Sequence, residues 1–127
     1  YTCEEAARST KSKPREHLKT MLLMDMNDSP AFALLPGDRR LNLRKAAKAL
    51  GVRELRLAIP KEVKDILDVE IGAVSVLLAE DIPALLDIEV IRNKLVYLSA
   101  GTHTESIVIN PRDLQRIVKA KLTSLID

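Results

Sequence analysis

The sequence has little that could cross-link, stack on bases or span a membrane. Its 127 residues include one cysteine, Cys3, which excludes an internal disulfide and a zinc site built from several cysteines. Aromatic residues make up only 2%, which argues against a surface that stacks on nucleobases. No apolar run reaches the roughly 18 residues of a membrane span, and no signal-peptide pattern is present. We therefore expect a cytoplasmic protein with no membrane partner.

Neither sign of charge dominates the chain. The 20 basic and 18 acidic side chains leave a net charge of +2, which does not by itself indicate a nucleic-acid binder. The basic residues are nevertheless gathered in two clusters: Arg8, Lys11, Lys13, Arg15 and Lys19, then Arg39, Arg40, Arg44, Lys45 and Lys48. Such clusters are either solvated faces or contacts for phosphate groups.

Aliphatic residues are abundant and must fill the core. Hydrophobic residues make up 46% of a chain that is long enough for one domain and too short for two ordinary ones. In the first half, a helix is expected over residues 3–8, capped by Thr2, and strands over 17–25 and 31–35, joined as a hairpin. A helix over 43–50 follows, between Asn42 as N-cap and Gly51 just past its end.

The second half continues with short elements. We expect a strand over residues 55–59, then a helix that begins at Pro60 with a buried stripe of Val63, Ile66 and Leu67. Strands are expected over 76–78 and 83–86, the latter at a sheet edge because Pro83 lacks a ladder donor, followed by a turn or brief helix over 87–91. The last expected elements are paired strands over 94–99 and 105–109, a helix capped by Asn110, and a strand over 120–126.

Helices and hairpins mix in this order without strict alternation of strand and helix. That order favours the α+β class, with a mixed, curled β-sheet or a small barrel and helices packed outside. In the last helix, Leu114, Ile117 and Val118 are expected to face inward. No linker or composition change divides the chain, so residues 1–127 are interpreted as one domain.

Familiar catalytic signatures are missing from the sequence. There is no GxxxxGK phosphate loop, no HExxH motif and no nucleophile–histidine signature. His17 is interpreted as a surface residue and His103 as a turn residue that more often faces solvent than acts in catalysis. Two distant histidines and scattered carboxylates do not form a persuasive metal site, so neither a metal nor another cofactor is expected.

Two features remain that could support chemistry. Lys19 interrupts an apolar strand, where a lysine either snorkels to water or meets an anion. Residues 71–75 form a small, apolar stretch in which Gly72 permits close approach to the main chain. This stretch is either a tight turn between core elements or a loop whose amides hold a carbonyl or phosphate oxygen. Together they are typical of a site that orients a labile ester without a side-chain nucleophile.

The sequence resembles the YbaK-type prolyl-tRNA editing domain family. The resemblance rests on four ordered segments that span nearly the whole chain: HLKTMLL, FALLPGDRRLNLRKAAKALGVRELRLA, EIGAVSVLL and LVYLSAGTHTESIVINPRDLQRI. Family members usually carry a further helix and strand before the point where this sequence begins, so the resemblance implies a domain that lacks them. It also implies the editing-domain fold and a trans-acting deacylase for mischarged tRNA, typically Ala- or Cys-tRNA(Pro), with prolyl-tRNA synthetase as a partner.

The resemblance also assigns the site. It implies that Lys19 holds the phosphate of the terminal nucleotide at the tRNA 3′ end and that the Gly72 backbone holds the aminoacyl carbonyl. The remaining residues of the implied substrate site are Thr20, Ala73, Val74, Ser75, Gly101, Thr102 and His103.

One position departs from the family pattern. Val76 stands where the family loop has a proline, which would stiffen the loop and fix its exit direction. The departure motivates an alternative function, in which the chain is a non-catalytic relative that binds tRNA or a synthetase.

Overall fold

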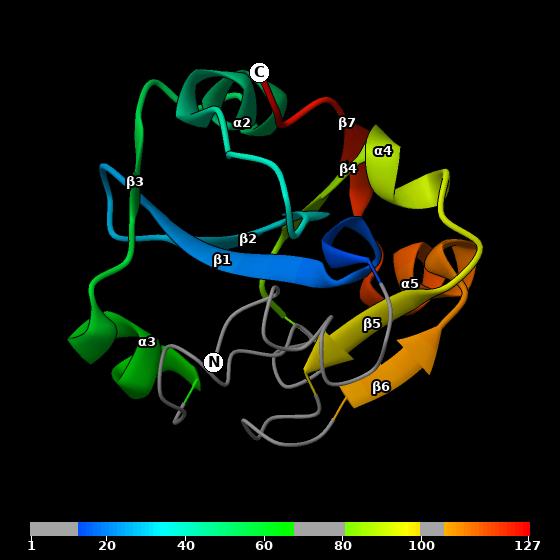
Figure 1. Cartoon of the computed structure of the whole chain (residues 1–127). Coiled ribbons are helices and arrows are strands. Elements are labelled where there is room, and N and C mark those ends of the chain that lie inside the picture. The colour runs from blue at the N-terminus through cyan, green and yellow to red at the C-terminus, as the bar shows by residue number, and fades with distance from the viewer. Residues whose placement is uncertain (1–12, 68–80, 100–105) are drawn as a thin grey trace.

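The computed structural model describes residues 13–67, 81–99 and 106–127, which are coloured in Figure 1. The helix expected over residues 3–8 and the strand expected over 76–78 lie outside these residues.

The expected mixed sheet is confirmed. Five strands form it in the order β3-β1-β2-β4-β7, and β5 and β6 form a separate antiparallel pair. Within the large sheet β1 pairs antiparallel with β2 and β3, whereas β4 runs parallel to β2 and β7. The strand bounds are Leu18–Asp25 (β1), Pro30–Pro36 (β2), Leu55–Leu57 (β3), Ala84–Asp87 (β4), Val96–Ser99 (β5), Ser106–Ile109 (β6) and Lys121–Thr123 (β7). Over the described residues the sheet is open, so the barrel alternative is not the arrangement found.

The β1–β2 hairpin forms as its sequence predicts, because the turn satisfies its own backbone. Oδ1 of Asp25 accepts hydrogen bonds from the amides of Asn27 and Ser29, at 2.8 and 2.9 Å. Asp28 takes the left-handed conformation, with φ 58°, which aspartate tolerates better than most residues. This turn fixes the register that places Leu22 opposite Phe32.

Two of the helices begin at the capping residues that the sequence predicts, Asn42 and Asn110. The helices are the 3-10 helix η1 (Pro14–Glu16), α2 (Leu43–Leu50), α3 (Pro60–Leu67), α4 (Ile88–Ile91) and α5 (Pro111–Val118). The Asn42 side chain accepts from the amides of Arg44 and Lys45, and Gly51 closes α2 with φ 72°, where glycine costs least. Asn110 caps α5 in the same way, and α4 is the brief helix expected over residues 87–91.

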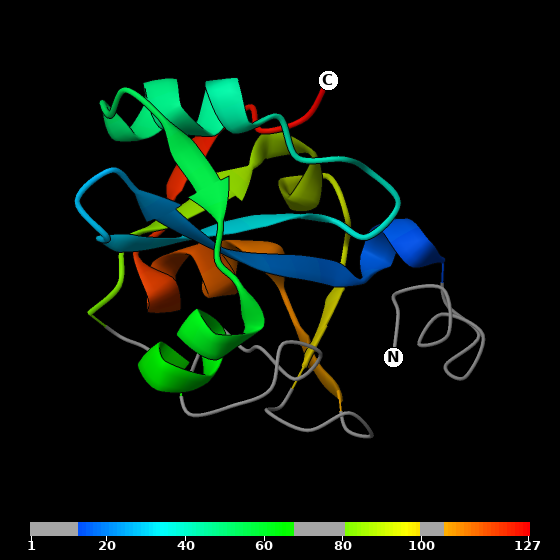
Figure 2. The same ribbon diagram turned by 90° about the vertical axis from the view of Figure 1, so that its left-hand side faces the viewer.

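The large sheet has an apolar cluster on each face. Leu23, Ala33 and Leu85 pack with Ala46 of α2 on one face. The other face carries the larger cluster, which includes Leu22 and Phe32 and is covered by α3, α5 and β5. Figure 2 shows α2 on one side of the sheet and α3, α5 and the β5–β6 pair on the opposite side. No helix in the described part of the chain is long and apolar enough to cross a bilayer.

The structure corrects the prediction that residues 83–86 form an edge strand. β4 lies inside the sheet, between β2 and β7, and Ala84, Leu85 and Leu86 are buried. Pro83 directly precedes the strand, where its missing donor costs nothing, and its carbonyl accepts from the amide of Phe32 at 2.8 Å.

The prediction that Ile66 and Ile117 belong to the core is also wrong. Ile66 is 36% exposed and Ile117 is 61% exposed. On α5 the buried stripe runs from Leu114 to Val118, four residues apart, and leaves Ile117 beside it. On α3, Val63 is the buried residue among the described side chains, and the Leu67 side chain lies outside the description. On α5, and over the described side chains of α3, the buried stripe is therefore narrower than the sequence predicts.

Asp87 is a buried carboxylate that joins two parts of the fold. Its Oδ2 accepts from the amide of Glu89 at 2.9 Å and so caps α4. Its Oδ1 accepts from the buried amide of Leu125 at 2.7 Å, which fixes the segment after β7. The side chain is 0% exposed, and both of its oxygens are paired.

Candidate functional site

Lys19 lies near the start of β1, on the sheet face that α2 covers. Side chains alternate along a strand, so Lys19 shares its face with Met21 and Leu23, which pack with Ala46 of α2. The side chain is half-buried, and its Nζ donates to the carbonyl oxygen of Arg39 at 2.8 Å. The lysine thus buries its stem and holds its charge at the end of the sheet.

Thr20 points to the opposite face. It pairs with Leu34 in the β1–β2 ladder and lies between Leu18 and Leu22, which belong to the larger core cluster with Leu114. The structure therefore does not bring Lys19 and Thr20 to the same side of the sheet, although they are neighbours in the sequence.

The other predicted site residues lie outside the described residues. They are Gly72, Ala73, Val74, Ser75, Gly101, Thr102 and His103. The described elements that flank them are α3, which ends at Leu67, and the paired strands β5 and β6. Val63 of α3 and Val96 and Leu98 of β5 belong to the cluster on the Thr20 face. The roles of these seven residues remain predictions.

A hollow of about 470 Å³ lies beside the start of β1 and is bounded by three segments distant in sequence. Its polar lining comes from η1, the connection between β2 and α2, and the end of α4: Arg15, Asp38, Arg39, Glu89, Arg92 and Asn93. Lys19 is not among the lining residues, but its ammonium donates to the carbonyl oxygen of Arg39, which is one of them.

His17 is buried, which corrects the prediction of a surface residue. Only 4% of it is exposed, and its ring stacks on Tyr97 with centroids 4.8 Å apart and planes 19° apart. A bridge between the same two residues joins the start of β1 to β5. Burial lowers the pKa of His17 from its ordinary value of 6.5, while the charge of Glu16 acts in the opposite direction. The contact with β5 explains why local sequence did not predict the burial.

Metal-binding geometry is not found among the described residues. No group of three His, Cys, Asp or Glu side chains in residues 13–67, 81–99 and 106–127 is placed to hold a metal ion.

Comparison with protein families decides the relationship. The model of the aminoacyl-tRNA editing domain matches residues 1–117. The chain belongs to the aminoacyl-tRNA editing domain family.

The editing domain is also similar to parts of longer proteins. The proline–tRNA ligase of Aquifex aeolicus is 30% identical over 119 residues, which cover 91% of this chain and 21% of the ligase. The ligase of Heliobacterium modesticaldum is 33% identical over 89 residues, covering 70% of this chain and 15% of that protein. The chain therefore spans about a fifth or less of these curated relatives.

Solved structures share the fold of the editing domain. A crystal structure described as a candidate trans-editing enzyme for prolyl-tRNA synthetase has a TM-score of 0.91 at 26% identity, covering 99% of this chain and 80% of that one. The structure of the hypothetical protein APE2540 has a TM-score of 0.92 at 25% identity, with coverage of 99% and 84%. Fold and family thus agree with the resemblance found in the sequence.

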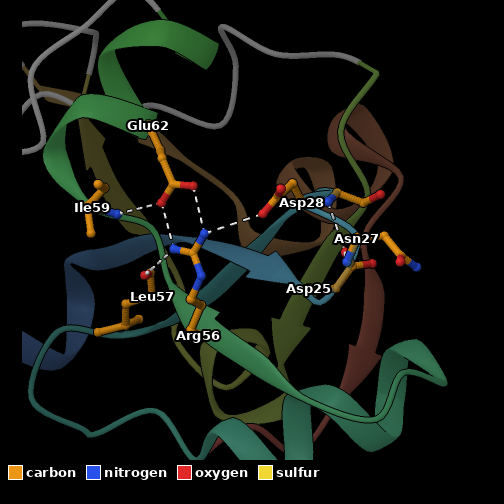
Figure 3. A network of polar contacts seen from close by, with 8 residues as sticks. Asp25, Asn27, Asp28, Arg56, Leu57, Ile59 and Glu62 are labelled. Carbon is orange, nitrogen blue, oxygen red and sulfur yellow. Dashed lines mark hydrogen bonds and ion pairs between the residues drawn. The ribbon is translucent and has the colours of Figure 1, made fainter.

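A polar network fixes the start of α3 in the editing domain (Figure 3). Arg56 of β3 holds both carboxylate oxygens of Glu62, at 2.6 and 2.8 Å, and lies 3.6 Å from the carboxylate of Asp28. Glu62 also accepts from the amide of Ile59 at 3.0 Å, which caps the helix. The hydrogen bonds from Arg56 and then from Ile59 lower the pKa of Glu62 to about 2. The ion pair of Arg56 and Glu62 therefore persists through mildly acidic pH.

The burial of His17 predicts a loss of stability in mild acid. Because the folded-state pKa lies below 6.5, the unfolded chain binds the proton more readily. The contribution of His17 to stability is complete above about pH 6.5 and is lost as the pH falls through the folded pKa. One proton permits a slope of at most roughly 1.4 kcal/mol per pH unit. Urea unfolding of the wild type at pH 7.5 and 5.5 should show this loss.

His17→Phe provides the comparison for that measurement, since phenylalanine keeps an aromatic ring against Tyr97 and cannot titrate. The difference in unfolding free energy between the two proteins should change between pH 7.5 and 5.5. Glu62 does not interfere, because its pKa of about 2 leaves it ionised at both values. Parallel pH profiles for the two proteins would contradict the prediction.

Sequence analysis missed two features of this region. Arg92 is an isolated arginine outside both basic clusters, and no local signal marks it. The contact between His17 and Tyr97 joins residues 80 positions apart. A pairing of β1 with the later hairpin was the only information that could have revealed it.

Proposed function

We propose that this editing domain is a trans-acting hydrolase that deacylates mischarged tRNA, with Ala-tRNA(Pro) and Cys-tRNA(Pro) as its preferred substrates. The observation that carries the proposal is the family match over residues 1–117. The solved relative described as a candidate trans-editing enzyme for prolyl-tRNA synthetase, and the ligase relatives, support prolyl-tRNA as the class. Prolyl-tRNA synthetase is the proposed partner, and the cytoplasm, where tRNA is charged, is the proposed compartment.

The proposed chemistry needs no side-chain nucleophile. An aminoacyl ester is already labile, so orienting its carbonyl with backbone amides and admitting a water lowers the barrier. In this proposal the backbone at Gly72 holds the carbonyl, with Ala73, Val74 and Ser75 forming the pocket wall and Gly101, Thr102 and His103 closing it. Lys19 holds the terminal phosphate, and Thr20 contributes to the substrate site. A narrow pocket admits alanine or cysteine and rejects larger side chains by steric clash.

The second candidate is a non-catalytic relative that binds tRNA or a synthetase. Val76, in place of the proline expected from the family pattern, is the observation that favours it. A loop without the proline samples more backbone conformations, which weakens the preorganisation that hydrolysis needs more than binding does.

A deacylation assay separates the two candidates. Purified protein is incubated with Ala-, Cys-, Ser- and Pro-tRNA(Pro), and the remaining aminoacyl-tRNA is measured over time. We expect Ala- or Cys-tRNA(Pro) to be hydrolysed and Pro-tRNA(Pro) to survive. If none of the four aminoacyl-tRNAs is hydrolysed and tRNA binding is still measurable, the proposed hydrolase activity is overturned and the second candidate is favoured. Activity gained by Val76→Pro would then identify the loop as the cause.

A further inference from the structure

Three arginines from distant parts of the sequence meet around one hollow. Arg15 belongs to the first basic cluster, Arg39 to the second, and Arg92 is the C-cap of α4. All three line the same space of about 470 Å³, and Figure 2 shows η1, the β2–α2 connection and α4 on one side of the molecule. We propose that this hollow binds the phosphate backbone of tRNA, as a contact region separate from the predicted Gly72 pocket. The inference rests on the proposed function, because it concerns the same substrate.

Each of the three guanidinium groups has N–H donors that are not used in the hydrogen bonds of the described residues. Within the described residues, the Arg15 side chain makes no hydrogen bond or ion pair. Arg39 uses one nitrogen to donate to the Asp127 carbonyl at 3.0 Å, and Arg92 pairs with Glu89 at 3.0 Å while remaining 74% exposed. A guanidinium has five N–H donors in a planar fork that matches two phosphate oxygens. Each of the three can therefore engage a phosphate without losing its present contact.

Hydrogen bonds connect the segments that line the hollow. Nδ2 of Asn93 donates to the carbonyl of Arg15 at 2.9 Å and ties α4 to η1. The amide of Gly37 donates to the carbonyl of His17 at 2.8 Å, and Lys19 donates to the carbonyl of Arg39 at 2.8 Å. These three bonds hold all three segments in place before any ligand arrives. Preorganisation of this kind reduces the ordering cost of binding.

The balance of charge favours a polynucleotide over a single small anion. The lining carries three arginines and two carboxylates, Asp38 and Glu89, which leaves an excess of positive charge. Lys19 adds a further positive charge where it donates to the carbonyl oxygen of Arg39. The arginines are exposed, so each contact with a phosphate is screened and weak by itself. A nucleic acid overcomes this weakness, because several neutralised phosphates release their counterions together. An isolated phosphate gains no such benefit.

Salt-dependent binding of uncharged tRNA(Pro) tests the proposal. Affinity is measured for the full chain at several salt concentrations, for the wild type and for Arg15→Gln, Arg39→Gln and Arg92→Gln. Each variant should lower affinity roughly three- to tenfold and reduce the slope of log K against log salt by about 1. Arg53→Gln is the matched control, since Arg53 is also exposed and does not line the hollow; it should leave affinity and slope unchanged.

Asp38→Asn distinguishes charge from damage to the fold. Removing this carboxylate from the hollow should tighten tRNA binding about threefold or more, a gain that misfolding cannot produce. Inorganic phosphate serves as the probe for the other source of the same chemistry. We expect no saturable binding of phosphate at concentrations that leave tRNA bound.

Either of two results would overturn the inference. In the first, the three arginine variants have the same tRNA affinity and the same salt slope as Arg53→Gln. In the second, the wild type binds phosphate tightly and the three variants abolish that binding while tRNA binding is unchanged. The assay uses no aminoacyl ester, so it is independent of hydrolysis. A chain that binds tRNA through these arginines but hydrolyses nothing contradicts the proposed activity alone. An active deacylase whose binding ignores the arginines contradicts this inference alone.

Discussion

Lys19→Ala should slow deacylation of the best mischarged tRNA by roughly 100-fold or more, the loss typical for one preorganised electrostatic contact in an active site. The ammonium is carried on a half-buried stem and donates to the carbonyl oxygen of Arg39, one of the residues that line the hollow. Alanine removes the charge that is proposed to hold the terminal phosphate. Single-turnover rates on Ala-tRNA(Pro) measure the effect directly.

The fold should survive this substitution. Lys19 makes one hydrogen bond through its side chain, to the carbonyl of Arg39, and the net value of such a bond is about 1 kcal/mol. Lys48→Ala is the matched control, because Lys48 is an exposed lysine on α2, outside the proposed site. A Lys19→Ala rate within twofold of the Lys48→Ala rate would remove Lys19 from the catalytic site.

Asp87→Ala should cost about 3 kcal/mol of unfolding free energy, the largest stability effect that we expect in this protein. The substitution leaves the buried amide of Leu125 and the first-turn amide of Glu89 without their acceptor. It also opens space at a fully buried position. Urea denaturation at neutral pH measures the change.

Two further variants sharpen this test. Asp87→Asn keeps the size and one acceptor oxygen, so its cost should lie between those of the wild type and Asp87→Ala. Asp113→Ala is the control, because Asp113 pairs with Arg116 on the surface of α5 and such pairs contribute less than about 1 kcal/mol. Equal unfolding midpoints for Asp87→Ala and Asp113→Ala would show that the buried carboxylate does not join α4 to the segment after β7.

Local sequence was a good guide wherever the chain satisfies its own backbone nearby. Asn42 and Gly51 bound α2 as predicted, and Asn110 starts α5, because each acts on amides or carbonyls within a few residues. It failed where a distant segment decides the outcome. Pro83 predicted an edge strand. In the structure β7, near the end of the sequence, pairs with the edge of β4 that β2 does not occupy.

The candidate site divides in the same way. The ordered segments of the sequence identified the family, and the family model confirms it over residues 1–117. Because side chains alternate along β1, Lys19 and Thr20 lie on opposite faces of the sheet. The predicted site had grouped these two neighbouring residues together.

By itself, the sequence determined the caps of α2 and the start of α5, the β1–β2 hairpin, the α+β class and the family, since these depend on short-range hydrogen bonding and on the order of motifs. Only the tertiary structure decided that His17 is buried against Tyr97 and that Arg15, Arg39 and Arg92 surround one hollow. These arrangements depend on contacts between segments tens of residues apart. Such contacts follow from how the sheet and helices pack, which no local pattern encodes.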